Sequence, residues 1–263
     1  MADPNRPQSP FAAMAGLSAR TPVQVLSPSE IEKILELHRL YLKTEYHEGH
    51  RANFTSADLS GRDFSGLDLR GIRMDRAVLR GADFTGARLQ SANLIGAILE
   101  QARLDRSDLS RARLSGANLV SASLEGARLA KTDMEFALMG NAALQDAKLC
   151  EADMSGAQLD AAVLSHADLR NANLRGAGFR GARLDGADLR DARLGSAFLV
   201  GASLRGADLR GAYMRLAKLD DADLSDANLV GAEGLTQAQL DQAHCSSGAT
   251  LPDGLTGVEH AKR

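Results

Sequence analysis

The chain of 263 residues has few large rings, few thiols and little net charge. It contains no Trp, 4% aromatic residues, two Cys and a net charge of −3. A compact core of this size normally uses more aromatic side chains, so the composition argues against an ordinary globular domain. The near balance of charge argues against a nucleic-acid-binding protein, which would show a basic excess. Two Cys without framework spacing argue against a disulfide-stapled fold.

Long apolar runs are also absent. No stretch approaches the roughly 18 apolar residues of a membrane span, so we expect no membrane contact. The start of the chain has no signal-peptide-like apolar run, and the two Cys, Cys150 and Cys245, are expected to be free thiols in a reducing compartment. These features favour a cytoplasmic protein. The opening Met-Ala-Asp-Pro does not resemble a transit peptide, which favours a bacterial cytoplasm, although a secreted effector without a cleavable signal stays open.

The chain does contain a strict period of five. From Phe54 to Leu229, every fifth residue is Leu, Met or Phe, which gives 36 sites without a slip. Ala stands two residues before 31 of these sites. A period of five matches neither the 3.6 residues of a helix nor the two residues of a strand. It therefore indicates one small structural unit that is repeated in space.

One unit shows how five residues can build a wall. Ala207 and Leu209 are two residues apart, so on an extended segment they point the same way, while Asp208 and Arg210 point the opposite way. Gly211 lets the chain turn a corner without a steric penalty. Repeating the unit predicts a tube with Leu and Ala inside and polar groups outside. A filled tube has no cleft, so we expect no catalytic residues, no cofactor and no enzyme activity.

The A(D/N)LXX units, as in Ala57-Asp58-Leu59 and Ala227-Asn228-Leu229, resemble the pentapeptide-repeat family over about 182 of the 263 residues. This resemblance implies an all-β solenoid, a right-handed quadrilateral β-helix with four units in each coil. The 36 units would then form nine coils and a rod about 43 Å long.

The resemblance also bears on function. It implies a non-catalytic protein-binding or scaffold protein that uses the outer faces or ends of a rigid rod. Some relatives modulate gyrase, a type II DNA topoisomerase, and are acidic mimics of DNA. The repeat region 51–232 departs from them because it holds 24 acidic and 24 basic residues. Modulation of gyrase is therefore the alternative function.

The repeat divides the chain into four parts. We predict a disordered tail over 1–25, a capping helix within 26–50, the β-helix over 51–232, and a C-terminal cap helix and tail over 233–263. Repeat stacks need such caps because their end layers expose apolar surface.

Each cap helix has a start signal. Ser27, Pro28 and Glu30 predict a helix that begins with a capping box, and Gly49 predicts its end. Thr236 and Gln239 form a second capping box, which predicts a short helix to about residue 243.

Three inward positions depart from Ala in a polar way. Arg62 would be costly in a dry core, so we expect it at the mouth of the tube, under the first helix and paired to an acid or to helix carbonyls. Ser107 and Thr132 are mild departures whose hydroxyls can bond backbone carbonyls.

Charged side chains recur on the outside of the tube. Asp168, Asp188 and Asp208 are 20 residues apart and each precedes an Arg by two, which predicts an Asp column beside an Arg column. His38, His47, Glu48 and His50 gather near the first helix, but their spacing fits no known metal motif. We expect no metal site and a charge-balanced, solvated surface.

The most informative outer residues are apolar. Aligned by a 20-residue coil, one face and its corners collect Val78, Ile98, Val120, Phe136, Leu138, Phe198, Val200 and Leu216. A clustered stripe of this kind marks either a docking site for a protein partner or a face covered by the terminal segments, and the sequence leaves both open. A dimer contact through the C-terminal segment would use Leu235, Leu240, Leu251 and Leu255. We expect an unidentified protein partner and no direct nucleic-acid binding.

Overall fold

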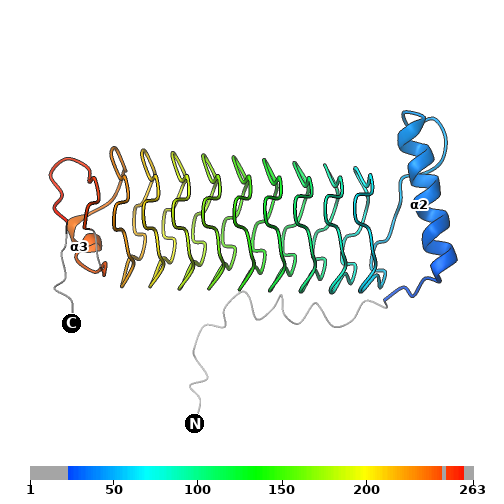
Figure 1. Cartoon of the computed structure of the whole chain (residues 1–263), viewed down its shortest axis with the longest axis horizontal. Helices are drawn as coiled ribbons and strands as arrows, with labels where there is room; N and C mark the ends of the chain where they lie inside the picture. Colours follow the sequence, from blue (N-terminus) through cyan, green and yellow to red (C-terminus); the bar gives the residue numbers. More distant parts are fainter. Residues whose placement is uncertain (1–22, 245–246, 258–263) are drawn as a thin grey trace, which may run out of the picture.

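The chain forms a straight rod of stacked coils with one helix at each end (Figure 1). This computed structural model describes residues 23–244 and 247–257. Helix α2, Pro28–Lys43, lies across one end of the rod, and the single turn of helix α3, Gln237–Leu240, lies at the other. Among the described residues, no helix has both the length and the apolar character that a membrane span requires.

The coils are joined by parallel β-bridges with a constant register. From Asn53 to Tyr213, each residue just before an apolar site pairs with the residue 20 positions later, as Asn53 does with Arg73 and Asp208 with Asn228. Backbone hydrogen bonds follow the same register, for example from Leu104 N–H to the Ser123 carbonyl at 2.7 Å. Four five-residue units therefore complete each coil, and every extended segment pairs with the coil above and below it. This architecture is a four-sided β-helix.

The inside of the rod is a continuous apolar core. All 36 sites of the period-five series are at most 1% exposed, and the small Ala sites between them are buried as well. Near the N-terminal end, the rings of Phe64 and Phe84 stack one coil apart, with centroids 5.0 Å apart. The predicted inward and outward alternation is confirmed along the repeat, except that Arg62 and Leu67 of the first coil are partly exposed.

Each corner is a β-turn whose third residue has a positive φ. Ala57 N–H donates to the Phe54 carbonyl at 3.0 Å and closes the first turn, and the same bond recurs at the later corners. The φ of Gly211 is +68°, as its predicted role at a corner requires. Ala161 has a φ of +57° at an equivalent corner, so the stacked coils impose this conformation even where the residue is not Gly.

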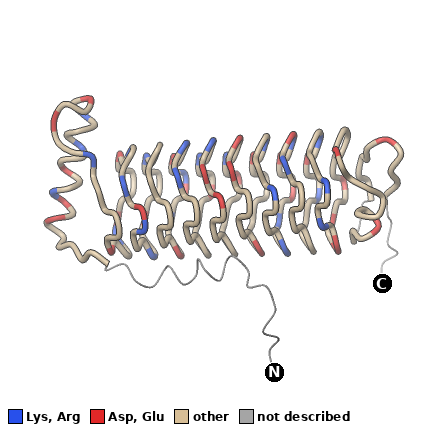
Figure 2. The backbone as a smooth tube through the Cα atoms, turned by 180° about the vertical axis from the view of Figure 1, so that it is seen from behind, with Lys and Arg blue, Asp and Glu red and all other residues tan. Residues whose placement is uncertain are grey.

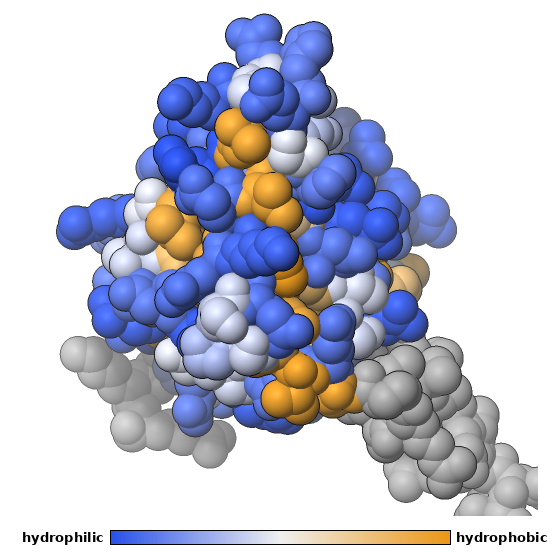
Figure 3. All heavy atoms as spheres, turned by 90° about the vertical axis from the view of Figure 1, so that its right-hand side faces the viewer, coloured by the Kyte–Doolittle hydropathy of each residue, from blue (hydrophilic) through white to orange (hydrophobic). Residues whose placement is uncertain are grey.

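Helix α2 begins as predicted. The Glu30 N–H donates to Ser27 Oγ, and the Glu30 carboxylate accepts from the Ser27 N–H at 2.7 Å. Ile31 and His38 face the rod and are buried. Seen along the rod axis, the surface over α2 is mainly polar, with a broken line of apolar side chains crossing it (Figure 3).

The predicted end of this helix near Gly49 is wrong. The helix stops at Lys43, and Thr44 caps it through its N–H and its hydroxyl, both of which bond the Leu40 carbonyl. The chain then doubles back along the helix. A Cβ at Gly49 would lie 2.2 Å from the Leu37 carbonyl oxygen, so Gly49 is required for this close approach and not for the helix end.

The predicted tail over 1–25 is also partly wrong. Gln24 pairs with Ala57, with its N–H bonded to the Ser56 carbonyl at 2.9 Å and its carbonyl accepting from the Asp58 N–H at 3.0 Å. The first coil has open backbone groups on this side, and the segment from Val23 satisfies them. The remainder of the predicted tail, residues 1–22, lies outside the described residues.

Of the three polar inward positions, two behave as predicted. The Ser107 hydroxyl donates to the Leu104 carbonyl at 2.6 Å, and the Thr132 hydroxyl donates to the Leu129 carbonyl at 2.7 Å. Arg62 does not form its predicted pair, because within the described part of the chain its guanidinium has no ion pair and no hydrogen bond. Its side chain is instead partly exposed on the first coil, where water can solvate it.

The C-terminal segment extends the rod along its axis. The capping box of Thr236 and Gln239 is present, but α3 ends at Leu240, before the predicted residue 243. Thr250 pairs with Asn228 of the last coil, and the Leu240 side chain is fully buried. The segment therefore packs on the last coil.

Candidate binding surface

One side of the rod carries most of the outward apolar side chains. We call it the apolar side and define it by the bridged column Asp58, Val78, Ile98, Asn118, Leu138, Gln158, Gly178, Phe198 and Lys218. Val78 and Ile98 are direct neighbours in this column, whereas Asn118 separates Ile98 from Leu138. Phe198, 44% exposed, lies three coils beyond Leu138. The alignment by 20 residues therefore brings these side chains to one side.

A second column on the same side lies two residues later in each unit. It contains Val120 and Val200, which are half-buried, together with Arg80, Glu100 and Arg180. Arg80 Nε lies 2.7 Å from Glu100 Oε2, and Glu100 Oε1 accepts from the Asn118 amide at 2.6 Å. The apolar side is thus interrupted by a small set of organised charges.

Two apolar residues occupy the corner at the edge of this side. Phe136 and Leu216 are 80 residues apart and lie on the same corner, with φ values of +55° and +60°. They are 44% and 65% exposed. The ring of Phe136 covers Gly156 in the next coil, where a Cβ would lie 2.5 Å from the ring. Gly156 therefore gives the ring its resting place on the surface.

Leu216 borders a shallow hollow at the same corner. The Tyr213 ring closes one wall by packing over Gly195, where a Cβ would lie 3.2 Å from the ring. Arg175, Gly176, Ser196 and Arg215 complete the lining. Its open, mixed lining suits a contact with another surface better than the enclosure of a small molecule.

The described terminal segments leave the apolar side uncovered. Residues 233–244 and 247–257 pack on the last coil, and Gln24 pairs with the first. Sequence reasoning missed Val23 and Val25, which are 47% and 84% exposed beside the first coil. The alternation Val-Gln-Val is the signal that identifies this short extended segment.

The four C-terminal leucines face inward. Leu240 is fully buried, and the other three, Leu235, Leu251 and Leu255, are half-buried against the core. These leucines pack on the last coil, while the dimer contact through this segment stays a prediction.

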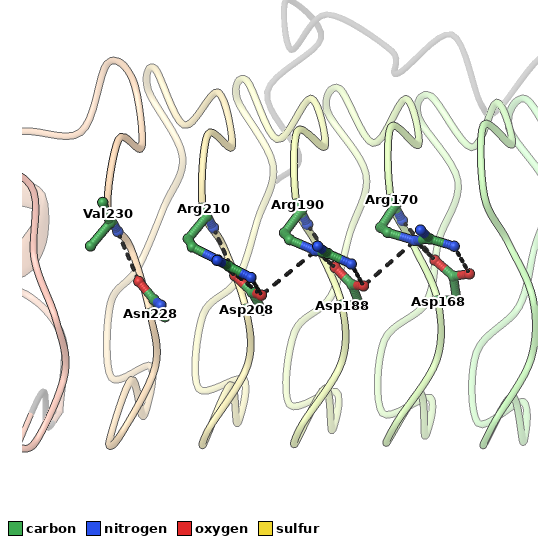
Figure 4. A network of polar contacts seen from close by, with 8 residues as sticks. All are labelled: Asp168, Arg170, Asp188, Arg190, Asp208, Arg210, Asn228 and Val230. Atoms are coloured by element: carbon green, nitrogen blue, oxygen red, sulfur yellow. Dashed lines mark hydrogen bonds and ion pairs between the residues drawn. The ribbon is translucent and has the colours of Figure 1, made fainter.

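The opposite side of the rod carries the predicted charge columns, which we call the ladder (Figure 4). Within one unit, Arg170 Nε and Nη2 each lie 2.8 Å from an oxygen of Asp168, and Arg190 and Arg210 repeat this geometry with Asp188 and Asp208. Between coils, Arg170 Nε lies 3.5 Å from Asp188 Oδ2.

Hydrogen bonds from Arg170 and Arg210 hold the pKa values of Asp168 and Asp208 below the ordinary Asp value. The ladder ends at Asn228, whose side-chain Oδ1 accepts the Val230 N–H at 3.2 Å. Because its charges are mutually neutralised, the ladder is suited to holding register more than to attracting a charged ligand.

Other polar groups of the described chain do not converge on a reactive site. Positive and negative residues alternate along the rod without a one-signed stripe in the view of Figure 2. The His47 ring donates from Nδ1 to the Thr44 carbonyl, 2.9 Å away. Among the described residues, no group of three or more His, Cys, Asp or Glu is placed to hold a metal ion. Cys150 is a free thiol, and Cys245 lies outside the described residues.

Comparison with known proteins agrees with this geometry. The family model of pentapeptide repeats matches eight copies over residues 52–90, 87–126, 107–146, 117–156, 157–195 and 197–233. The chain belongs to the pentapeptide-repeat family. Pentapeptide-repeat proteins are right-handed β-helices, in agreement with the fold predicted from the sequence. A comparison with curated proteins finds no match.

Several solved structures are similar to this pentapeptide-repeat protein. HetL of the cyanobacterium Nostoc, involved in regulating heterocyst differentiation, is 31% identical over 87% of this chain and 94% of its own, with a TM-score of 0.38. A thylakoid-lumen protein of Arabidopsis thaliana is 38% identical over 36% of this chain and 63% of its own, with a TM-score of 0.30. QnrB1, a plasmid-mediated fluoroquinolone resistance protein, is 21% identical over 75% of this chain and 90% of its own, with a TM-score of 0.48.

Proposed function

We propose that this pentapeptide-repeat protein is a non-catalytic scaffold that binds a protein partner through its apolar side. In this proposal the rod has nine coils, is closed by the caps at its two ends, and acts in the cytoplasm of a bacterium. The observation that carries the proposal is the gathering of Phe136, Phe198 and Leu216, each at least 44% exposed, along one side and its corner. Clustered exposed apolar side chains commonly mark protein interfaces.

The filled interior supports a binding role. The 36 apolar sites of the period-five series are buried, so apolar side chains line the interior of the rod. Aromatic side chains such as Phe136 and Phe198 are enriched at the cores of protein interfaces. Rigid packing in the coils also means that these rings are held in place before a partner binds, which lowers the entropy cost of binding.

The alternative is modulation of a type II DNA topoisomerase. It draws support from the wider family, whereas the similarity to QnrB1 at 21% identity concerns the fold. A DNA-mimicking surface needs an acidic face, and the equal numbers of acidic and basic residues in the repeat region do not supply one. The alternative is therefore the weaker proposal.

The test is capture of partners from the source organism by the full chain. A bait carrying Leu138→Asp and Phe198→Asp alters the apolar side and keeps every inward site. A matched control, Ala130→Asp with Val230→Asp, adds the same two charges to the ladder side. We expect partners to be held by wild type and the control and lost by the apolar-side variant. Equal capture by all three baits would refute the proposal, and a captured topoisomerase subunit would establish the alternative.

A further inference from the structure

The outward residues near one end of the apolar side are complementary in charge and size to those at the same distance from its other end. Leu138 stands at the midpoint of the bridged column, with Asp58 and Lys218 each four coils away in opposite directions. Opposite charges at the two ends of one surface allow that surface to match itself when it is reversed. Such self-complementarity is the requirement for an interface between two copies related by a twofold axis.

The geometry of that pairing follows from the regular coils. A twofold axis along the extended segment of Leu138, in the plane of contact, reverses the rod axis of the second copy. A residue that lies a given number of coils before Leu138 then faces the residue the same number of coils after it. Each of the two columns of the apolar side therefore faces the same column of the second copy.

The bridged column matches itself at every level under this operation. Leu138 meets Leu138 of the second copy at the axis. Moving outward, the facing pairs are Asn118 with Gln158, Ile98 with Gly178, Val78 with Phe198, and Asp58 with Lys218. These are an amide pair, a large side chain over a Gly, an apolar pair and an ion pair.

The second column adds a further ion pair on each side of the axis. Glu100 faces Arg180 of the second copy, and Gly140 at the axis lets the two backbones approach closely. Within the described residues, neither Arg180 nor Lys218 takes part in an ion pair in its own chain. Both cations are therefore available to the carboxylates that face them.

In the second column, two charged residues face an apolar residue of the second copy, and both already have a partner in their own chain. Arg80, which faces Val200, already pairs with Glu100 at 2.7 Å. Asp160, which faces Val120, accepts the Arg180 N–H at 3.0 Å. Neither charge is left without a partner in the contact, so neither opposes the pairing strongly.

The corner beside this side repeats the pattern. Phe136 lies level with Leu138, and its ring leans over Gly156 of the next coil. Under the twofold operation this ring faces Gly116 of the second copy, where even a Cβ would have no atom within 4 Å, so each ring has room against the other chain. Aromatic side chains near the centre of an interface are a common source of binding energy.

We propose that the partner of the apolar side is a second copy of this chain, packed with its rod reversed about Leu138. The inference rests on the proposed function and names the partner of the same surface. One side about 10 Å wide and about 43 Å long buries roughly 900 Å² in total, at the small end of specific interfaces. Interfaces of this size are commonly weak, so we expect the dimer to dissociate in the micromolar range.

The test is the mass of the full chain in solution, measured by sedimentation equilibrium from about 1 to about 200 μM. Wild type, with a protomer of 27.9 kDa, should approach twice that mass. Leu138→Asp places two carboxylates against each other at the axis and should remain monomeric throughout. The ladder-side control Ala130→Asp should dimerise like wild type.

A charge exchange tests the reversed register itself. Asp58→Lys and Lys218→Asp should each weaken the dimer by about tenfold, because each places like charges opposite each other twice in the dimer. The two substitutions together should restore wild-type affinity. Circular dichroism verifies that each variant keeps the wild-type fold. A parallel arrangement of the rods gives no such restoration.

Three results would overturn this inference. A dimer that persists in Leu138→Asp, or single variants that the double variant does not rescue, would place the contact elsewhere, as in the C-terminal segment. A wild type that dimerises only after removal of residues 1–22 would assign the apolar side to that segment. A wild type that is monomeric at all concentrations would exclude the second copy, while the proposed function would still stand if partner capture depended on Leu138 and Phe198.

Discussion

The backbone at the corners makes a prediction that depends on conformation alone. Ala161 and Gly201 lie on the same corner, two coils apart, with φ values of +57° and +64°. Ala161 is exposed, and a Cβ at Gly201 would have no atom within 4 Å. Exchanging the residue at either site therefore changes the cost of a positive φ and leaves the packing alone.

The magnitude follows from two opposing terms. A left-handed conformation costs a residue with a Cβ about 1–2 kcal/mol, and Gly removes that cost. Gly also raises the conformational entropy of the unfolded chain, which lowers stability by about 0.4–1 kcal/mol. Ala161→Gly should therefore raise the free energy of unfolding by about 0.5–1 kcal/mol, and Gly201→Ala should lower it by a similar amount.

The assay is urea unfolding followed by circular dichroism. The midpoint should shift in opposite directions for the two variants, with an unchanged dependence on urea because the surface exposed on unfolding is the same. Gly186→Ala serves as a contrast, since its Cβ would lie 2.7 Å from the His166 ring and adds a steric cost. A less stable Ala161→Gly, or a neutral Gly201→Ala, would refute the reasoning.

The remaining predictions concern the core, the N-terminal cap and the ladder. Leu144→Ala removes a fully buried side chain and should lower the free energy of unfolding by about 2–5 kcal/mol in urea titrations. Burial of His38 lowers its pKa, against the attraction of Asp68, so the neutral ring is favoured in the folded state. Stability from His38 should thus be present above pH of about 6.5 and decline below it, and His38→Gln should abolish that decline in amide exchange of α2. Arg190→Gln removes one step of the ladder, but the side chain is 39% exposed, so the urea midpoint should fall only slightly and by less at high salt.

The repeat could be predicted in detail because one rule governs every unit. The inward Leu and Ala sites, the corners and the 20-residue register all follow from the alternation of side chains and the need to turn after each short segment. The columns of Asp168 and Leu138 were predictable for the same reason, since a fixed register determines which residues are neighbours.

The ends of the rod could not be predicted to the same degree. Helix α2 stops at Lys43, whereas the nearest Gly is needed where the chain passes Leu37. The Val-Gln-Val alternation indicates an extended segment around Gln24, but the place where it pairs depends on the open edge of the first coil. Arg62 is solvated because the mouth of the tube is incompletely covered, and coverage is a property of tertiary structure.

The binding surface is intermediate between these cases. Its apolar residues could be aligned from the sequence, but their exposure depends on where the terminal segments lie. The exposure of Val23 and Val25 depends on how their segment pairs with the first coil. The partner of the surface stays a proposal. The backbone of the rod is the same on all four sides, so only the outward side chains distinguish one side from another.

The 20-residue register also limits how such a chain can change its length. Loss of 20 residues would shorten the rod by one coil and leave the ladder and the apolar side in line from end to end. Loss of five residues would keep the core intact yet turn everything beyond it by one side, so that Phe198 would leave the side that holds Leu138. A change of length therefore preserves the surface pattern only when it adds or removes whole coils. Loss of a single five-residue unit would disrupt the binding surface of a protein that still folds.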